Sequence, residues 1–112
     1  MTATRSGAFA GLRVADFAWV GVGPTVSKYL ADHGAEVIRI ESNTYPEAVR
    51  RAGPFVDDIP GVDRSGYYAN FNSSKLGISV NWKHPRGPEL LKRLVARCDV
   101  VTESFTPGTM AR

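Results

Sequence analysis

The chain has 112 residues, of which 43% are hydrophobic and 22% are charged, a composition typical of a globular domain and not of a disordered segment. Its 14 Lys and Arg residues are scattered among 11 Asp and Glu residues, so a net charge of +3 favours a polyanionic small ligand over nucleic acid. The single cysteine, Cys98, cannot form an internal disulfide, and no secretory or membrane-length apolar segment occurs. We therefore expect a cytoplasmic protein with neither a membrane partner nor a metal site.

The first part of the chain predicts one β-loop-α-β unit between Leu12 and Glu41. An apolar strand leads into a glycine-rich turn, and a second apolar strand follows a helix that Pro24 opens and Gly34 closes. Such a unit presents backbone N–H groups at the start of a helix, where an anion binds favourably. Residues 1–10, which precede it, are expected to be a loose arm.

One face of this helix is predicted to pack on the sheet. The residues at i, i+3, i+4 and i+7 are Val26, Tyr29, Leu30 and His33. Because His33 falls in the last turn, its position favours capping of carbonyl groups or packing at the sheet edge over a catalytic role.

Residues 42–65 carry prolines and glycines among mixed charges, which excludes a long regular element. We predict a long loop with a short helix around residues 47–51. Loops of this length are uncommon in small domains and often form lids or binding edges. Next, Tyr67, Tyr68 and Phe71 indicate a short helix anchored by aromatic residues.

The second half of the chain predicts another strand, helix and strand. Residues 76–82 alternate between apolar and polar, which is typical of a strand with one buried face. A helix follows Pro85, and a short strand is expected at residues 100–102. The apolar stripe of the helix consists of Leu90, Leu91, Leu94, Val95 and Cys98. Cys98 is interpreted as a small buried hydrophobic residue.

This order of elements predicts an α/β fold: a Rossmann-like, open and mostly parallel sheet with flanking helices. Ligands of such sheets bind at the carboxyl ends of the strands. Three loops are expected there: residues 18–23, the residues from Glu41 onward, and residues 103–108.

A dinucleotide-binding turn is the first alternative for the glycine-rich loop. Gly21 and Gly23 follow a strand, and Glu41 lies about twenty residues further on, where a ribose-binding acid would be expected. However, Val26 occupies the third glycine position, and Pro24 removes an N–H donor that would hold the pyrophosphate. Dinucleotide binding is therefore the less favoured interpretation.

Three segments in the same order give a more specific match. They are GLRVADF followed by GP, then YLADHGAEVIRIE, then LGISVNWKHPRGPELLKRLVARCDVVTESFTPG. With these segments the chain resembles the N-terminal part of class III CoA-transferases and their racemase relatives, and the resemblance covers nearly everything after Gly11.

The resemblance implies that residues 11–112 are a C-terminally truncated part of a Rossmann-like CoA-binding domain in a larger fold of two interlocked subunits. An acyl-CoA and a second copy of the full-length protein are then the expected partners, with CoA acting as a substrate and no prosthetic group. In the family's transferases an aspartate becomes acylated and then carries CoA as a thioester. That aspartate would lie beyond Arg112, so this chain is expected to hold no catalytic residue and to be inactive alone.

The resemblance also assigns CoA-contacting positions. They are Val20, Gly21, Val22, Ser42, Val80, Lys83, Ser104, Phe105 and Arg112. Lys83 and Arg112 would meet the CoA phosphates, and Phe105 would offer an aromatic surface. Ser42 and Ser104 depart from the arginine and asparagine that are common in the family, so affinity or substrate choice is expected to differ.

Two further interpretations stay open. The parent enzyme could be an α-methylacyl-CoA racemase-type isomerase in place of a transferase. Alternatively, the chain could be a non-catalytic CoA-binding or partner-binding subunit, since its Ser, His and Cys residues are isolated and His84 is interpreted as a turn residue.

Overall fold

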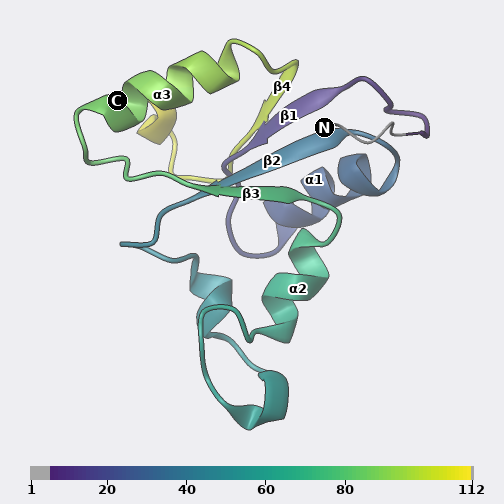
Figure 1. Ribbon diagram of the computed structural model, residues 1–112, viewed down its shortest axis with the longest axis vertical. Helices are drawn as coiled ribbons and strands as arrows, with labels where there is room; N and C mark the ends of the chain where they lie inside the picture. Colours follow the sequence, from purple (N-terminus) through teal and green to yellow (C-terminus); the bar gives the residue numbers. More distant parts are fainter. Residues whose placement is uncertain (1–5, 112) are drawn as a thin grey trace.

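The computed structural model describes residues 6–111 and has an α/β architecture, which confirms the predicted fold class (Figure 1). Four parallel strands form one sheet in the order β3-β2-β1-β4. The strands are β1 (Arg13–Asp16), β2 (Glu36–Glu41), β3 (Leu76–Ser79) and β4 (Val100–Thr102). The α-helices are α1 (Val22–Asp32), α2 (Gly66–Asn72) and α3 (Arg86–Val95), and the 3₁₀ helices are η1 (Ala48–Arg51), η2 (Val56–Asp58) and η3 (Thr109–Ala111).

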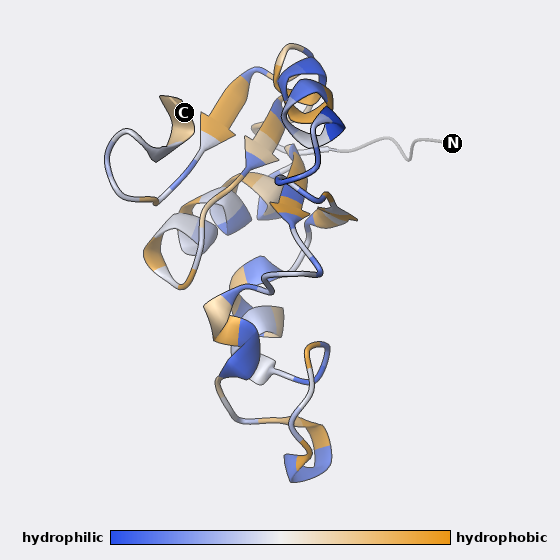
Figure 2. Cartoon of the chain, turned by 90° about the vertical axis from the view of Figure 1, so that its left-hand side faces the viewer, coloured by the Kyte–Doolittle hydropathy of each residue, from blue (hydrophilic) through white to orange (hydrophobic). Residues whose placement is uncertain are grey.

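Helices α1 and α3 cover opposite faces of the sheet (Figure 1). Because successive side chains of a strand point to opposite faces, each inner strand supplies residues to two apolar clusters. Val14 and Val37 pack with Ala31 on the α1 face. Ala15 and Ile40 belong to the cluster on the α3 face. The strands accordingly carry hydrophobic residues in Figure 2, as expected for a sheet covered on both sides.

The predicted buried face of α1 is wrong for most of its length. Val26 and Tyr29 are 54% and 65% exposed, and the residues of α1 that are buried are Pro24, Ser27 and Ala31. These smaller side chains allow the helix axis to approach the sheet closely, which a stripe of large residues would prevent.

Pro24 and the residues at the C-terminal end of α1 explain where this helix begins and ends. The helix begins at Val22, two residues before Pro24, which is tolerated in the first turn because its missing N–H would have no intrahelical acceptor there. At the other end the Nδ1 atom of His33 lies 2.8 Å from the carbonyl of Tyr29, as the predicted capping role requires. Gly34 follows with a φ of 109°, a conformation that glycine adopts without strain.

Strand β3 is shorter than the predicted strand of residues 76–82. It lies at an edge of the sheet and pairs only with β2, and its Leu76 and Ile78 side chains are 49% and 39% exposed. After Val80, whose N–H donates to the carbonyl of Glu41, the chain turns at Asn81. The predicted apolar stripe of α3 packs on the sheet as expected, except for Leu90, which is exposed.

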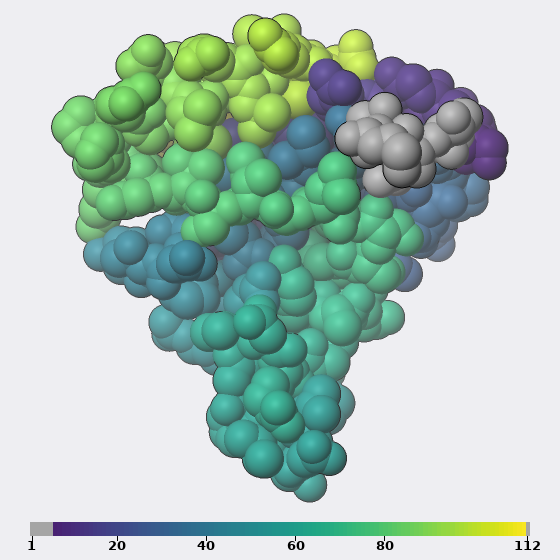
Figure 3. All heavy atoms as spheres, in the orientation of Figure 1, coloured from purple at the N-terminus to yellow at the C-terminus, as the bar shows by residue number. Residues whose placement is uncertain are grey.

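The long loop between β2 and β3 projects from the sheet and gives the molecule its tapered shape (Figure 3). The predicted short helix is present as η1, and Glu47 caps it by accepting a hydrogen bond from the N–H of Val49. Within residues 6–111, no helix combines the length and the apolar composition needed to span a bilayer.

The part of the predicted arm that the structure describes, residues 6–10, forms a turn against the end of α1. The N–H of Phe9 donates to the carbonyl of His33 over 2.9 Å. A side chain at Gly34 would collide with the carbonyl of Ser6.

Candidate functional site

All four strands are parallel, so their carboxyl ends lie at one edge of the sheet. The segments that follow them are residues 17–21, 42–47, 80–85 and 103–108. Every described position that the resemblance assigned to CoA lies in one of these segments or at the start of α1. Arg112, assigned to a CoA phosphate, lies outside the described residues.

The turn between β1 and α1 is held in an unusual conformation. Val20 has a φ of 70°, in the left-handed region that β-branched residues avoid. Its N–H donates to Oε1 of Glu47 over 2.7 Å. Its side chain is 54% exposed, so the strain is stored at the surface of the candidate site.

The loop after β4 packs directly against this turn. Oγ of Ser104 accepts a hydrogen bond from the N–H of Trp19 at 2.9 Å and donates to the carbonyl of Trp19 at 3.2 Å. A Cβ atom at Gly23 would lie 2.6 Å from Cβ of Ala18 and 3.3 Å from Cβ of Ser104. Glycine is therefore required at position 23 for the two loops to meet.

The start of α1 provides open donors. The side chains of the surrounding loops accept hydrogen bonds from the N–H groups of Ala18, Trp19 and Val20. The next three N–H groups, of Gly21, Val22 and Gly23, have no hydrogen-bond acceptor among residues 6–111. Val22 is 85% exposed. This end of the helix can accept an anionic group.

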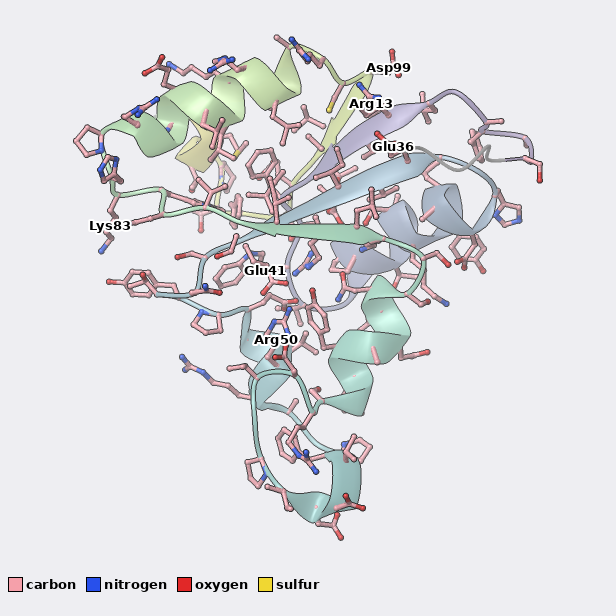
Figure 4. All side chains as sticks on the ribbon, in the orientation of Figure 1. Arg13, Glu36, Glu41, Arg50, Lys83 and Asp99 are labelled. Carbon is pink, nitrogen blue, oxygen red and sulfur yellow. The ribbon has the colours of Figure 1, made fainter. Side chains whose placement is uncertain are left out.

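Lys83 lies beside Tyr45, a residue for which the sequence predicts no role. Its Nζ atom donates to the Tyr45 hydroxyl over 2.8 Å and lies 4.5 Å from the centre of the Tyr45 ring. The hydrogen bond and the positive charge of Lys83 lower the pKa of the Tyr45 hydroxyl. The pair presents a cation and a hydroxyl. Lys83 itself lies in the segment that follows the carboxyl end of β3 (Figure 4).

The remaining assigned positions are less exposed. Ser42 is buried, and its Oγ accepts a hydrogen bond from the N–H of Thr44 at 3.1 Å. Phe105 packs edge-on against Trp19 and Trp82, with ring centroids 6.1 Å and 5.9 Å away. The indole N–H groups of both tryptophans are buried without an acceptor in the described part of the chain.

Beneath this edge lies a buried ionic network on the α1 face of the sheet. Asp16 and Arg39 are opposite each other in the register of β1 and β2, and both are almost completely buried. Oδ2 of Asp16 accepts hydrogen bonds from Oγ of Ser27 and Nζ of Lys75, each at 2.9 Å. Arg39 in turn donates to Oε2 of Glu47 at 2.6 Å.

Glu41 connects this network to the long loop (Figure 4). Arg50 donates to both Glu41 oxygens at 2.8 Å and 2.9 Å, and the Tyr68 hydroxyl donates to Oε1. Burial raises the pKa of Glu41, but hydrogen bonds from Arg50 and Tyr68 and the charges of Arg50 and Arg39 outweigh it and hold the pKa at about 2. Burial and the hydrogen bond to Glu41 raise the pKa of Tyr68 to about 12. Glu41 is therefore ionised and Tyr68 protonated at neutral pH.

This network is not among the features predicted from the sequence, although part of its signal is visible there. Asp16 interrupts the apolar β1, and Arg39 and Glu41 alternate with isoleucines in β2. Charged residues in strands covered on both faces must be paired, so these positions indicated buried ion pairs. Nothing comparable marks Glu47 or Lys75, whose positions depend on how the loops fold.

Comparison with known proteins identifies the family. A model of CoA-transferase family III matches residues 9–112. This chain belongs to CoA-transferase family III. It is 39% identical over 105 residues to a formyl-CoA:oxalate CoA-transferase of Bradyrhizobium diazoefficiens, and the match covers 94% of this chain and 24% of that relative. A protein of the same description from Rhodopseudomonas palustris strain TIE-1 is 40% identical over 102 residues, which cover 91% and 23% of the two chains.

Solved structures of similar proteins show the same fold. The chain superimposes on a CAIB/BAIF family protein from Brucella suis with a TM-score of 0.83 at 35% identity, covering 96% of this chain and 28% of that one. A hypothetical protein from Mycobacterium tuberculosis gives a TM-score of 0.80 at 31% identity, with the same coverages of 96% and 28%. This family III chain therefore spans about a quarter of the length of the relatives it matches.

Proposed function

We propose that this chain binds the CoA part of an acyl-CoA along the carboxyl edge of its sheet, as part of an enzyme that transfers CoA between an acyl-CoA and a carboxylic acid. Membership of CoA-transferase family III supports this proposal. The observation that carries it is the convergence of four strand-following segments at one edge, which offers open N–H donors, a lysine and aromatic rings to one ligand.

In this proposal Lys83 and the N–H groups at the start of α1 bind phosphate oxygens, because both are donors that favour negative charge. Phe105 and its neighbouring tryptophans provide the apolar surface for the uncharged parts of CoA. When Lys83 binds the ligand, the hydroxyl of Tyr45 can donate a second hydrogen bond to it.

The chemical step belongs to residues outside this chain in our proposal. An aspartate carboxylate attacks the thioester carbonyl and the CoA thiolate leaves, which gives a mixed anhydride. The thiolate then attacks the aspartyl carbonyl of this anhydride, and the donor acid leaves as its carboxylate, which gives an aspartyl-CoA thioester. The acceptor carboxylate then attacks the aspartyl-CoA thioester, and the same two steps run in reverse order to give the new acyl-CoA and the free aspartate. We further propose that the active assembly is a homodimer, and that residues 1–112 alone turn over no substrate.

The binding step is tested by titrating CoA into the chain in an isothermal titration calorimeter. We expect saturable binding, and Lys83→Ala should raise the dissociation constant about threefold to tenfold, because one exposed charge-assisted contact to a phosphate is lost. Arg97→Ala is the matched control, since it removes an exposed positive charge beside Gly11 and Asp99 at the amino ends of the strands, and it should leave the dissociation constant unchanged.

NAD serves as the competing ligand in the same experiment. If NAD bound as tightly as CoA, or if Lys83→Ala and Arg97→Ala had equal effects, the proposed site would be wrong.

A further inference from the structure

Glu47 links the buried ionic network to the strained turn. It lies in the long loop, 27 residues after Val20 in the sequence, and its side chain is completely buried. One carboxylate oxygen accepts the N–H of Val20 at 2.7 Å and that of Val49 at 3.3 Å. The other accepts from Arg39 at 2.6 Å.

Arg39 and Asp16 hold Ala18, two residues before Val20 in the same turn. Arg39 donates to the carbonyl of Ala18 at 2.5 Å, and Oδ1 of Asp16 accepts the Ala18 N–H at 3.1 Å. A valine in the left-handed region persists only where its surroundings determine the conformation. Glu47 is the side chain that bonds the backbone of Val20 itself.

We propose that Glu47 is a positioning residue of the CoA site: it fixes the turn of residues 18–23 so that the N–H groups of Gly21, Val22 and Gly23 face the ligand. This inference rests on the proposed function for its ligand. Glu47 of the long loop thus controls the conformation of the β1–α1 turn, although it lies far from that turn in the sequence.

The chemistry of the contact requires a carboxylate. Glu47 accepts hydrogen bonds on both oxygens, from a backbone N–H on one side and a guanidinium on the other. Glutamine has the same shape but only one acceptor oxygen, and its NH₂ group would face a donor. Glu47→Gln must therefore lose either the contact to Val20 or the contact to Arg39.

The first experiment compares Glu47→Gln with Glu41→Gln in the full chain. Glu41 belongs to the same network and is converted to the same amide, but it makes no contact with residues 18–23. We expect the dissociation constant for CoA to rise about tenfold in Glu47→Gln, since the binding-competent turn becomes a minor conformation, and less than about twofold in Glu41→Gln.

A spectroscopic measurement separates positioning from general loss of stability. In a ¹⁵N-labelled chain, the amide proton of Val20 should resonate downfield, as a donor to a carboxylate does, and should move upfield in Glu47→Gln but not in Glu41→Gln. If Glu47→Gln does not fold, Glu47→Asp replaces it, because it keeps the charge beside Arg39 but withdraws the carboxylate from Val20.

A double-mutant cycle with Val20→Gly tests the role of backbone strain. Glycine adopts the left-handed conformation without cost, so the turn should depend less on Glu47 in that background. We expect Glu47→Gln to raise the CoA dissociation constant only about threefold when Val20→Gly is present, measured against Val20→Gly alone.

The outcomes distinguish this inference from the proposed function. Absence of saturable CoA binding by the unsubstituted chain would overturn the proposed function, while the Val20 amide shift would still test the positioning. Normal binding by the unsubstituted chain, with equal effects of Glu47→Gln and Glu41→Gln or an unmoved Val20 resonance, would overturn the positioning role of Glu47.

Discussion

Buried charges of both signs are brought together beneath the carboxyl edge. The acids are Asp16, Glu41 and Glu47, and the bases are Arg39, Arg50 and Lys75. Removing charges from water costs several kcal/mol per ion, and pairing offsets that cost only where the remaining hydrogen-bonding atoms are also satisfied. Asp16 meets this condition, because Ser27, Thr102 and the Ala18 N–H saturate its oxygens beside Lys75.

Glu41 should make folding stability depend on acidic pH. Its pKa is about 2 in the folded chain, against an ordinary value of 4.5 for a glutamate side chain. The stabilisation is thus fully present above about pH 4.5 and is lost as the pH falls toward 2, with a total on the order of 3 kcal/mol. Urea unfolding measured between pH 2 and 6 should show this loss.

Glu41→Gln provides the control for this pH dependence. The amide does not titrate, so the variant should be less stable at pH 6 and should lose less stability on acidification. Parallel curves for the two proteins would contradict the assignment to Glu41.

The contacts of individual side chains are the part of this structure that is least predictable from the sequence. Asp16 and Arg39 could have been recognised as buried partners, because they interrupt apolar strands. Tyr45 and Glu47 could not, because neither lies in a periodic element and their contacts depend on how the loop after β2 returns to the sheet. The strained conformation of Val20 also has no sequence signal, since valine is the wrong residue for a positive φ.

Two helices illustrate why periodicity predicts one packing face and misses another. In α3 the large apolar residues identify the buried side, because Leu91, Leu94 and Val95 fill the space above the sheet. In α1 the buried side is formed by small residues, while Val26 and Tyr29 face outward. Hydrophobicity alone cannot distinguish a face that packs closely from a face that further polypeptide would cover.

Close packing of α1 against its neighbours makes position 23 intolerant of a side chain. Gly23→Ala should lower the free energy of unfolding by about 1–3 kcal/mol, since a new Cβ would lie 2.6 Å from that of Ala18. Gly77→Ala is the matched control, because a Cβ there meets nothing within 4 Å, and its effect should stay within about 0.5 kcal/mol. Urea denaturation measures both, and equal stabilities would show that α1 does not approach the loops as described.

For the whole molecule, the order of strands and helices along the chain predicted the α/β class and the parallel sheet. Strand order was not accessible in the same way, because β4 pairs with β1 through contacts some 86 residues apart in the sequence. Both edge strands, β3 and β4, have a free side in the described chain, and Val22, Val26 and Tyr29 form an uncovered apolar stripe on α1. Free strand edges and uncovered apolar stripes of this kind are surfaces at which other protein segments or copies can pack.

The carboxyl and amino ends of the strands, here called the carboxyl edge and the amino edge, differ in their free hydrogen-bond donors. The carboxyl edge holds the open donors and Lys83. The amino edge holds the Arg13–Glu36 ion pair, at 2.7 Å, and Asp99, which accepts the N–H of Arg13 (Figure 4). An anionic ligand has donors available at the first edge and already paired charges at the second.

The most direct test is a CoA titration of the ¹⁵N-labelled chain, followed by the amide resonances of both edges. We predict saturable shifts at residues 20–23, 83 and 104–105, with the resonances of Arg13, Glu36 and Asp99 unchanged. Shifts centred on those amino-edge residues, or no saturable shift at any described residue, would contradict the proposal that the carboxyl edge binds CoA.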